Sequence, residues 1–111
     1  MELKEGMYVR TKWGYICELI NINDFREPTM RYGVEASYLR DVMFIGDEDI
    51  LKASNNIIDL IEVGDYVNGY EVTSKDQFLG FGNYDWYMLD NEIKSIVTKE
   101  QFESLQYKVG D

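Results

Sequence analysis

The amino-acid sequence predicts a mostly β protein built from two small antiparallel units. The chain has 111 residues, of which 45% are apolar and 14% aromatic, which is enough for one compact domain or two very small ones. Its strand-forming runs are short and are separated by turn signals. A segment of the first half, residues 3–9, is echoed 58 residues later at 61–67. Together these observations favour two related β units.

The echoed segment carries an apolar residue, then a glycine, and then the pair Tyr-Val. Gly6 precedes one copy of this pair and Gly64 precedes the other. Glycine adopts positive φ without strain, so each copy predicts a tight turn followed by a strand. We therefore expect an N-terminal unit at 1–54, a short helical connector at 55–60 and an acidic C-terminal unit at 61–111.

The first unit has the pattern of a curled antiparallel meander. Aromatic and β-branched residues dominate its strands, and a polar stretch with the only proline, Pro28, predicts a loop. The expected elements are strands at 7–11 and 15–22 joined by a hairpin at 12–14, a loop at 23–30, an ambiguous stretch at 31–40 and a strand at 41–45 that ends at the acidic turn 46–49.

Helix-capping and turn signals define the elements that follow. Asn68-Gly69 is the strongest hairpin signal, because both residues tolerate the left-handed conformations of a type I′ turn. Thr98 and Gln101 form a capping-box pattern. The expected elements are a helical turn within 54–61, strands at 65–67, 70–74, 77–81, 86–89 and 92–97, turns at 82–83 and 90–91, a helix at 99–105 and an edge strand at 107–109.

The short helix at 99–105 places Phe102 and Leu105 on one face, where they can close the end of a barrel. We therefore expect two Src-homology-three-like barrel units with one or two short helices. Either unit alone is marginal at about fifty residues, so mutual packing or a homodimer is expected to contribute stability.

The charge of the chain is strongly negative and unevenly distributed. Asp and Glu number 21 against 11 Lys and Arg, which gives a net charge of −10, and there is no histidine. Residues 1–56 carry a net charge of −3, and residues 57–111 carry −7. Such a field repels nucleic acids and anionic membranes and attracts basic proteins. Without histidine, proton chemistry near pH 7 would need strongly shifted carboxylates or a thiol, so we expect no enzyme.

Cys17 is the only cysteine and lies in an apolar run, so it is expected to be a small core residue. The acidic run Asp47-Glu48-Asp49 lacks the spacing of a calcium-binding loop and is interpreted as a solvated turn. No metal or cofactor is therefore expected. The N-terminus lacks a signal-peptide pattern, and there is no apolar stretch of membrane-spanning length, so a cytoplasmic location is expected.

The candidate binding residues lie in the more acidic second unit. The run Tyr84-Asp85-Trp86-Tyr87 lies between two turn signals, with Asp90 and Glu92 close behind, so aromatic rings and carboxylates can share one exposed surface. Such a surface suits a basic, arginine-bearing protein partner, because arginine can stack on the rings and pair with the acids at once. The alternative is that alternate aromatic residues fill a barrel while the acids point outward. The full candidate set is Asp76, Tyr84, Asp85, Trp86, Asp90, Glu92, Glu100 and Glu103.

Three segments carry a resemblance to a known group of proteins. Residues 57–69 and 93–103, with the opening segment 5–11 and Trp13-Gly14, resemble small uncharacterised proteins encoded by phages and prophages of Gram-positive bacteria. The resemblance implies a phage context and carries over no catalytic residues. Phage inhibitors of CRISPR nucleases include acidic DNA mimics, which are similar to this chain in charge and origin only.

These observations support three functional hypotheses. The leading one is a phage-encoded, non-enzymatic inhibitor whose carboxylates occupy a basic nucleic-acid channel of a host defence protein, such as a CRISPR effector nuclease. The alternative is a small structural or regulatory adaptor in which grooves and aromatic anchors dominate over charge. An enzyme acting through paired carboxylates is third, and would require two adjacent buried acids in a pocket.

Overall fold

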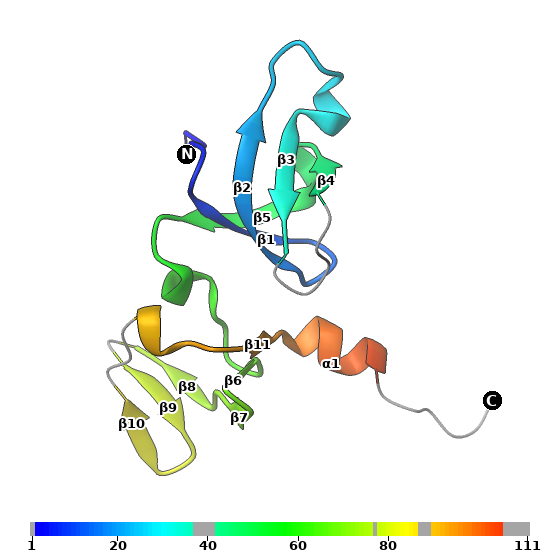
Figure 1. Ribbon diagram of the computed structural model, residues 1–111. Coiled ribbons are helices and arrows are strands. Elements are labelled where there is room, and N and C mark those ends of the chain that lie inside the picture. Colours follow the sequence, from blue (N-terminus) through cyan, green and yellow to red (C-terminus); the bar gives the residue numbers. More distant parts are fainter. Residues whose placement is uncertain (1, 37–41, 77, 87–89, 106–111) are drawn as a thin grey trace, which may run out of the picture. The chain divides into compact units, whose positions relative to one another are not determined.

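The computed structural model describes residues 2–36, 42–76, 78–86 and 90–105 (Figure 1). The chain separates into two compact units, Met1–Leu60 (unit 1) and Ile61–Asp111 (unit 2). Among the described residues, strand residues outnumber helical residues and form three small antiparallel sheets, which confirms the mostly β prediction. In each of them the outermost described strands pair on one side only, so the predicted closed barrels are not confirmed.

Unit 1 is built on one five-stranded sheet with the order β4-β3-β2-β1-β5. The hairpin predicted around residues 12–14 joins β1 and β2, and β3 occupies part of the stretch that the sequence left ambiguous. Three 3-10 turns complete the unit: η1 at Pro28–Met30, η2 at Asp47–Asp49 and η3 at Ile57–Leu60. The strands are β1 Tyr8–Thr11, β2 Ile16–Ile22, β3 Tyr32–Glu35, β4 Val42–Ile45 and β5 Ile50–Ser54.

The strand β5 is a correction to the sequence analysis, which ended the unit's strands at the acidic turn. It pairs antiparallel with β1, with Tyr8 opposite Ser54 and Arg10 opposite Lys52. Its first residues, Ile-Leu-Lys, do not alternate between apolar and polar, so periodicity gives no strand signal there. The strand forms because β1 offers it a partner far away in the sequence.

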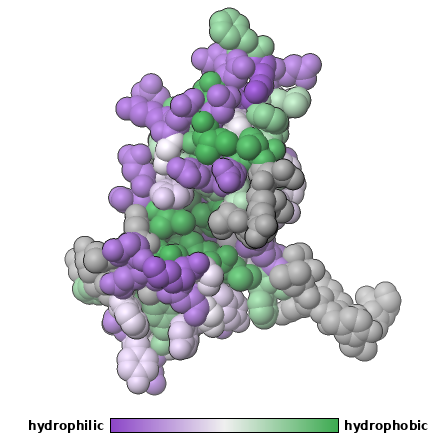
Figure 2. Space-filling view, in the orientation of Figure 1, coloured by the Kyte–Doolittle hydropathy of each residue, from purple (hydrophilic) through white to green (hydrophobic). Residues whose placement is uncertain are grey.

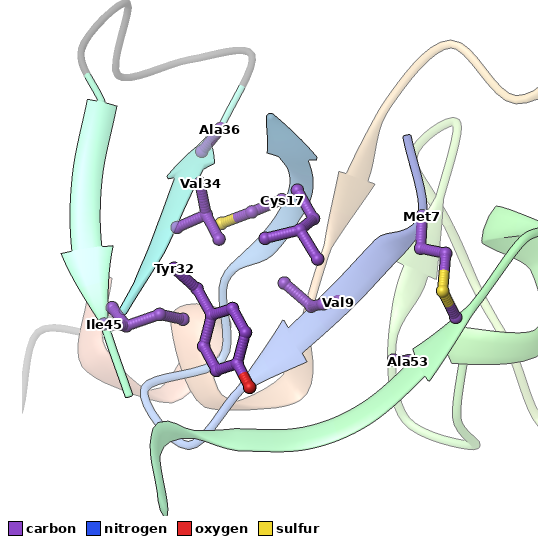
Figure 3. Close-up of a cluster of buried hydrophobic side chains, with 9 residues drawn as sticks. Met7, Val9, Cys17, Tyr32, Val34, Ala36, Ile45 and Ala53 are labelled. Atoms are coloured by element: carbon purple, nitrogen blue, oxygen red, sulfur yellow. The ribbon is translucent and has the colours of Figure 1, made fainter. Parts of the chain in front are cut away.

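The core of unit 1 lies on one face of this sheet, where small and branched side chains point toward one another (Figure 3). Val9, Leu19 and Val34 have no exposed surface, and their burial contributes roughly 1.5–3 kcal/mol each. Cys17 is buried among them, as predicted. Desolvation by burial raises the pKa of its thiol to about 11, so the thiol is neutral at pH 7. The cluster comprises Met7, Val9, Cys17, Leu19, Tyr32, Val34, Ala36, Ile45 and Ala53.

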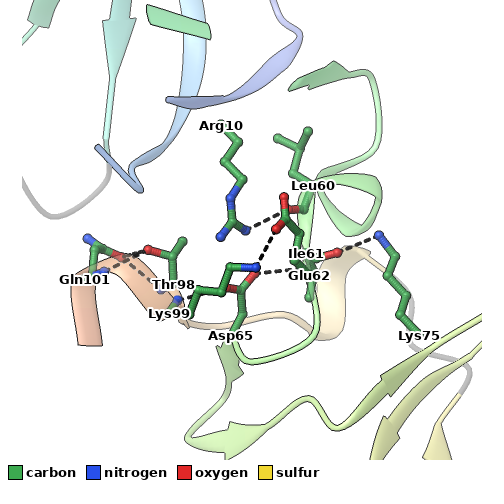
Figure 4. Close-up of polar contacts among 9 residues, drawn as sticks. All are labelled: Arg10, Leu60, Ile61, Glu62, Asp65, Lys75, Thr98, Lys99 and Gln101. Atoms are coloured by element: carbon green, nitrogen blue, oxygen red, sulfur yellow. Dashed lines mark hydrogen bonds and ion pairs between the residues drawn. The ribbon is translucent and has the colours of Figure 1, made fainter. Parts of the chain in front are cut away.

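Charged side chains in unit 1 are tied to its strands and turns. Arg10 is fully buried, and its Nη1 donates to the carbonyl of Leu60 at 2.9 Å (Figure 4). In the acidic turn, Asp49 lies 2.8 Å from Lys12 Nζ. The hydrogen bond from Lys12, followed by the amide of Gly46, lowers the pKa of the Asp49 carboxyl. Among the described residues, no cluster of three or more His, Cys, Asp or Glu side chains could hold a metal ion.

Unit 2 contains two three-stranded sheets with the orders β11-β6-β7 and β10-β9-β8. Asn68 and Gly69 both have positive φ, +53° and +86°, which confirms the predicted hairpin between β6 and β7. The elements are β6 Tyr66–Val67, β7 Tyr70–Glu71, β8 Ser74–Lys75, β9 Leu79–Phe81, β10 Tyr84–Trp86, η4 Asp90–Glu92, β11 Ile96–Val97 and α1 Lys99–Leu105.

Three strand predictions in unit 2 are corrected. The strand expected at 70–74 is divided, because the chain leaves one sheet after Glu71 and enters the other at Ser74, with Val72 buried between them. The strand expected at 86–89 begins earlier, at Tyr84, and 87–89 lie outside the described residues, as do residue 77 and the edge strand expected at 107–109. Only Ile96–Val97 of the strand expected at 92–97 is extended in a sheet.

Polar side chains hold the segments of unit 2 together (Figure 4). The buried Asp65 carboxylate accepts from the amides of Glu62 at 2.7 Å and Lys99 at 2.9 Å. Lys99 Nζ lies 2.9 Å from Glu62 Oε1. Thr98 and Gln101 form the predicted capping box, since the amide of each is bonded to the side chain of the other at 3.1 and 3.2 Å. The Asp65 and Glu62 contacts tie the start of α1 to the first turn of the unit.

The helix α1 places Phe102 against Tyr66, with their ring centroids 4.8 Å apart. Phe102 is nevertheless 39% exposed, so it packs against the single strand β6 and does not close a barrel. The side chain of Leu105, the other residue expected to close the barrel, lies outside the described part.

Candidate functional site

Unit 2 contains a groove with a volume of about 880 Å³, which we call the aromatic groove. It is open to solvent along one side and lies within the size range of sites that bind ligands or peptide side chains. Its walls come from the β6–β7 hairpin, the β9–β10 hairpin and the segment around η4. The lining residues are Val67, Asn68, Tyr70, Phe81, Tyr84, Asp85, Trp86, Glu92 and Lys94.

The β9–β10 hairpin provides the aromatic wall. Gly82 turns the chain with φ of +68°, so that Tyr84 lies opposite Phe81 in the register. Strand alternation puts Tyr84 and Trp86 on the same face of β10, and they are 75% and 54% exposed. Tyr70 from the other hairpin meets Phe81 edge-on, with centroids 6.4 Å apart, and is 69% exposed. Several large rings in one groove therefore remain open to solvent.

Asn68 positions the opposite wall. Its left-handed backbone conformation turns the β6–β7 hairpin, and its side chain reaches across to the segment that follows η4. The Asn68 amide group donates to the carbonyl of Glu92 at 2.9 Å, and its Oδ1 accepts from the amides of Lys94 at 2.7 Å and Ser95 at 3.1 Å. These three bonds provide partners for a backbone carbonyl and two backbone amides in the part of 92–97 that does not form the predicted strand. They also place Glu92 beside the aromatic wall.

Two carboxylates lie in the groove without a cationic partner among the described residues. Glu92 Oε2 accepts from Trp86 Nε1 at 3.1 Å, and this bond fixes the edge of the indole ring. The exposed Asp85 has neither a side-chain hydrogen bond nor an ion pair within the described part of the chain. The one lysine of the groove, Lys94, directs its Nζ to the carbonyl of Asn91 at 2.9 Å. The groove thus combines exposed aromatic surface with two carboxylates against one lysine.

Figure 2 shows this mixture at the lower end of the view, where Figure 1 places β8, β9 and β10. Tyr and Trp are nearly neutral on the hydropathy scale and take a pale tint, and pale residues lie there beside purple hydrophilic ones. An aromatic binding surface of this kind is therefore less conspicuous than an aliphatic patch of the same area.

The structure brings together about half of the residues predicted from the sequence. Tyr84, Asp85, Trp86 and Glu92 line the aromatic groove. Asp76, Glu100 and Glu103 do not line it, and the side chain of Asp90 lies outside the described part. Five further residues line the groove that were not predicted from the sequence: Val67, Asn68, Tyr70, Phe81 and Lys94. Of these, only Asn68 carried a local signal, and that signal predicted a turn and not a site.

A second feature of the surface lies in unit 1. Glu18 of β2 and Glu35 of β3 are directly opposite each other in the sheet register, and both are exposed. No cation lies within ion-pair distance of either carboxylate in the described ranges. Tyr8 is opposite Glu18 on the other side and lines the same shallow groove of about 220 Å³. Like charges in this arrangement destabilise a sheet.

Comparison with known proteins yields no match: no protein-family model, curated protein or solved structure matches the chain. Among the described residues, no helix has both the length and the apolar character needed to cross a membrane. The function must therefore be inferred from the chemistry of the aromatic groove and of the charged surface.

Proposed function

We propose that the protein is a non-enzymatic protein-interaction module that binds a segment of a basic partner in the aromatic groove of unit 2. The observation that carries the proposal is the coincidence, in one groove, of exposed Tyr70, Tyr84 and Trp86 with the carboxylates of Asp85 and Glu92, neither of which has an ion pair among the described residues. Tyr and Trp are enriched in the centres of protein interfaces, where they account for much of the binding energy.

Charge supports a basic partner over a neutral or acidic one. Residues 57–111 contain four basic and eleven acidic residues, so the groove lies in the more negative half of the chain. The field of that half attracts cationic segments before contact and repels acidic ones. The exposed rings then provide the short-range contacts that hold the segment.

The bulged sheet of unit 1 supports the same class of function, because Src-homology-three-like barrels are common interaction modules. β1 pairs with both β2 and β5, and the register shifts between Arg10 and Thr11 and between Leu19 and Asn21. Such shifts bend and curl a sheet toward a barrel. We extend the proposal to the phage context of the resemblance, in which the partner is a basic host protein such as a CRISPR effector nuclease.

The proposal is tested by titrating the full chain with short fluorescent peptides of basic, neutral and acidic composition and measuring anisotropy. We expect the basic peptides to bind. We expect Trp86→Ala to lower their affinity about 30-fold, because the substitution removes a central aromatic anchor. The matched control is Asp76→Asn, which alters an exposed carboxylate outside the groove and is expected to change affinity less than about twofold. Affinity that is independent of peptide charge, or unchanged in Trp86→Ala, would contradict the proposal.

A second candidate function is polyanion mimicry, and the opposed pair Glu18 and Glu35 favours it. The like charges of the pair destabilise the sheet, and among the described residues no cation lies within ion-pair distance to offset the repulsion. The spacing of the two carboxylates is fixed by the two strands. Such fixed carboxylates suit a channel that binds a nucleic-acid backbone with Lys and Arg. The two functions separate on mutation: Glu18→Lys with Glu35→Lys abolishes competition with DNA for such a channel, whereas Trp86→Ala leaves that competition intact. Binding that does not weaken with added salt would exclude the mimic.

A further inference from the structure

We infer that the aromatic groove recognises an arginine side chain of the bound segment, in preference to lysine. The inference rests on the proposed function and adds the identity of the residue that the groove selects. It follows from how Trp86, Glu92 and Asp85 are arranged.

The hydrogen bond between Trp86 and Glu92 fixes a flat ring beside a carboxylate. The indole donates to Oε2 of Glu92 at 3.1 Å, so one edge of the ring points at the carboxylate and about half of the indole surface stays open. Oε1 of Glu92 has no hydrogen-bond partner among the described residues. The ring face and the free oxygen are therefore both available to one incoming group.

A guanidinium group meets both requirements at once, whereas an ammonium group does not. It is planar, stacks on an aromatic face and donates in its own plane to an acceptor at the edge of the ring. The ammonium of lysine is a compact and strongly hydrated charge with no flat face to stack. Asp85, the other groove carboxylate without an ion pair in the described part, adds charge that favours either cation and disfavours an anion.

Within unit 1, one arginine makes both kinds of contact, with an aromatic ring and with a side-chain oxygen. The Arg26 guanidinium lies 4.0 Å from the centroid of the Phe44 ring. Its Nη1 also approaches the side-chain oxygen of Asn21, at 3.5 Å. Phe44 lies across Gly33, whose missing side chain leaves room for the ring. An arginine bound in the groove would make this pair of contacts with a larger ring and a charged acceptor.

The inference is tested with full-length protein in which Trp13→Phe leaves Trp86 as the only tryptophan. The emission of Trp86 is followed during titration with short basic peptides that differ only at one central position, which is arginine, lysine or the neutral isostere citrulline. We expect the arginine peptide to bind about tenfold more tightly than the lysine peptide, and the citrulline peptide to bind most weakly.

Glu92→Gln is the decisive variant, because a glutamine oxygen still accepts from Trp86 Nε1 while the charge is lost. We expect it to reduce the preference for arginine to about twofold, with an unchanged unfolding midpoint as the check on folding. Glu103→Gln removes the same charge from unit 2 outside the groove and is expected to leave the preference intact. Trp86→Phe keeps a ring face and loses the bond to Glu92, so its preference for arginine is expected to lie between those of Glu92→Gln and Glu103→Gln. Because this variant lacks the Trp86 emission, its affinities are measured by the anisotropy of labelled peptides.

The outcomes separate this inference from the proposed function. Equal affinity for the arginine and lysine peptides, with both weakened in Trp86→Ala as measured by the anisotropy of labelled peptides, overturns the arginine preference and leaves the binding module standing. An equal loss in Glu92→Gln and Glu103→Gln assigns the effect to the overall charge and also overturns it. If no basic peptide changes the emission of Trp86, both proposals fail.

Discussion

Unit 1 and unit 2 enter their first strands through the same turn. Gly6 and Gly64 have φ values of +93° and +98°. The amide of Gly6 donates to the carbonyl of Leu19 at 2.7 Å, and the amide of Gly64 donates to the carbonyl of Val72 at 2.8 Å. The echo between residues 3–9 and 61–67 thus corresponds to one local structure that is used twice.

The residue after each glycine also makes equivalent contacts. The amides of Met7 and Asp65 donate to the carbonyls of Lys4 and Glu62, three residues earlier, at 3.2 and 3.0 Å. Their side chains then accept from the amides of the same two residues, through Met7 Sδ at 3.2 Å and Asp65 Oδ2 at 2.7 Å. A thioether and a carboxylate therefore occupy the same position and perform the same local task.

The side chains of Met7 and Asp65 differ in their further contacts. Met7 packs into the apolar cluster of the five-stranded sheet. Asp65 instead uses its second oxygen to bind the amide of Lys99 at the start of α1. Both units bury apolar side chains, and unit 2 adds a buried carboxylate that ties the start of α1 to its first turn. Several aromatic rings of unit 2 remain exposed and line the groove.

The largest predicted effects come from removing the organising residue of each unit. Leu19→Ala leaves a cavity under the sheet of unit 1 and is expected to lower the free energy of unfolding by about 3 kcal/mol. Asp65→Ala leaves two amides without their charged acceptor and is expected to cost a similar ~3 kcal/mol.

Urea denaturation measures both losses, and amide hydrogen exchange assigns them. Exchange at Glu62 and Lys99 is expected to accelerate in Asp65→Ala more than exchange in β1 and β2 does. Asp65→Asn keeps one acceptor oxygen and is the matched control. Its free energy of unfolding is expected to lie between those of the wild type and Asp65→Ala. An Asp65→Ala variant as stable as the wild type would show that unit 2 is held by apolar contacts like unit 1.

Sequence reasoning succeeded where a feature is set by neighbouring residues. The positive φ of Gly6 and Gly64, the type I′ turn at Asn68 and the capping box at Thr98 are all local conformations that particular residue types favour. The clustering of Tyr84, Asp85 and Trp86 is local too, and this part of the candidate site was found from the sequence.

The features that sequence reasoning missed depend on residues far apart in the chain. β5 exists because β1 pairs with it, and the chain between Glu71 and Ser74 changes sheets because β9 receives β8. The groove residues Tyr70 and Phe81 come from different sheets, so no local pattern could place them together. Long-range pairing of short strands leaves little trace in hydrophobic periodicity.

A sharper test of the repeated turn uses a matched pair of substitutions. Gly6→Ala and Gly64→Ala both force a side chain onto a positive φ, which is expected to destabilise the protein by about 1–2 kcal/mol in each case. A Cβ at Gly6 would meet nothing within 4 Å, and one at Gly64 would meet Lys99 Cδ at 3.4 Å, an ordinary contact. Backbone strain therefore dominates at both positions. Urea denaturation should give equal losses in the free energy of unfolding for the two variants, within error. Unequal losses would show that the two turns are not equivalent.

The smallest predicted effect is a dependence on alkaline pH that belongs to unit 1. Burial raises the pKa of Cys17 from 9.0 to about 11, and the bond to Asp47, followed by burial, raises the pKa of Tyr32. A raised pKa means that the folded state holds its proton more tightly than the unfolded chain does, so the stabilisation is complete below pH 9 and is lost as the pH rises toward 11. The thiol alone is expected to account for about 1 kcal/mol of lost stability at pH 10.

Urea denaturation at pH 7 and pH 10 measures this loss, and Cys17→Ala removes the contribution of the thiol. We expect the variant to lose about 1 kcal/mol less than the wild type between the two pH values. Tyr32→Phe, which removes the phenol and its bond to Asp47, is expected to reduce the remaining dependence. Because both groups belong to unit 1, amide exchange in β1 and β2 should accelerate with pH beyond the chemical rate. If the acceleration were confined to unit 2, alkaline sensitivity would have to arise from its polar anchors and not from the apolar core.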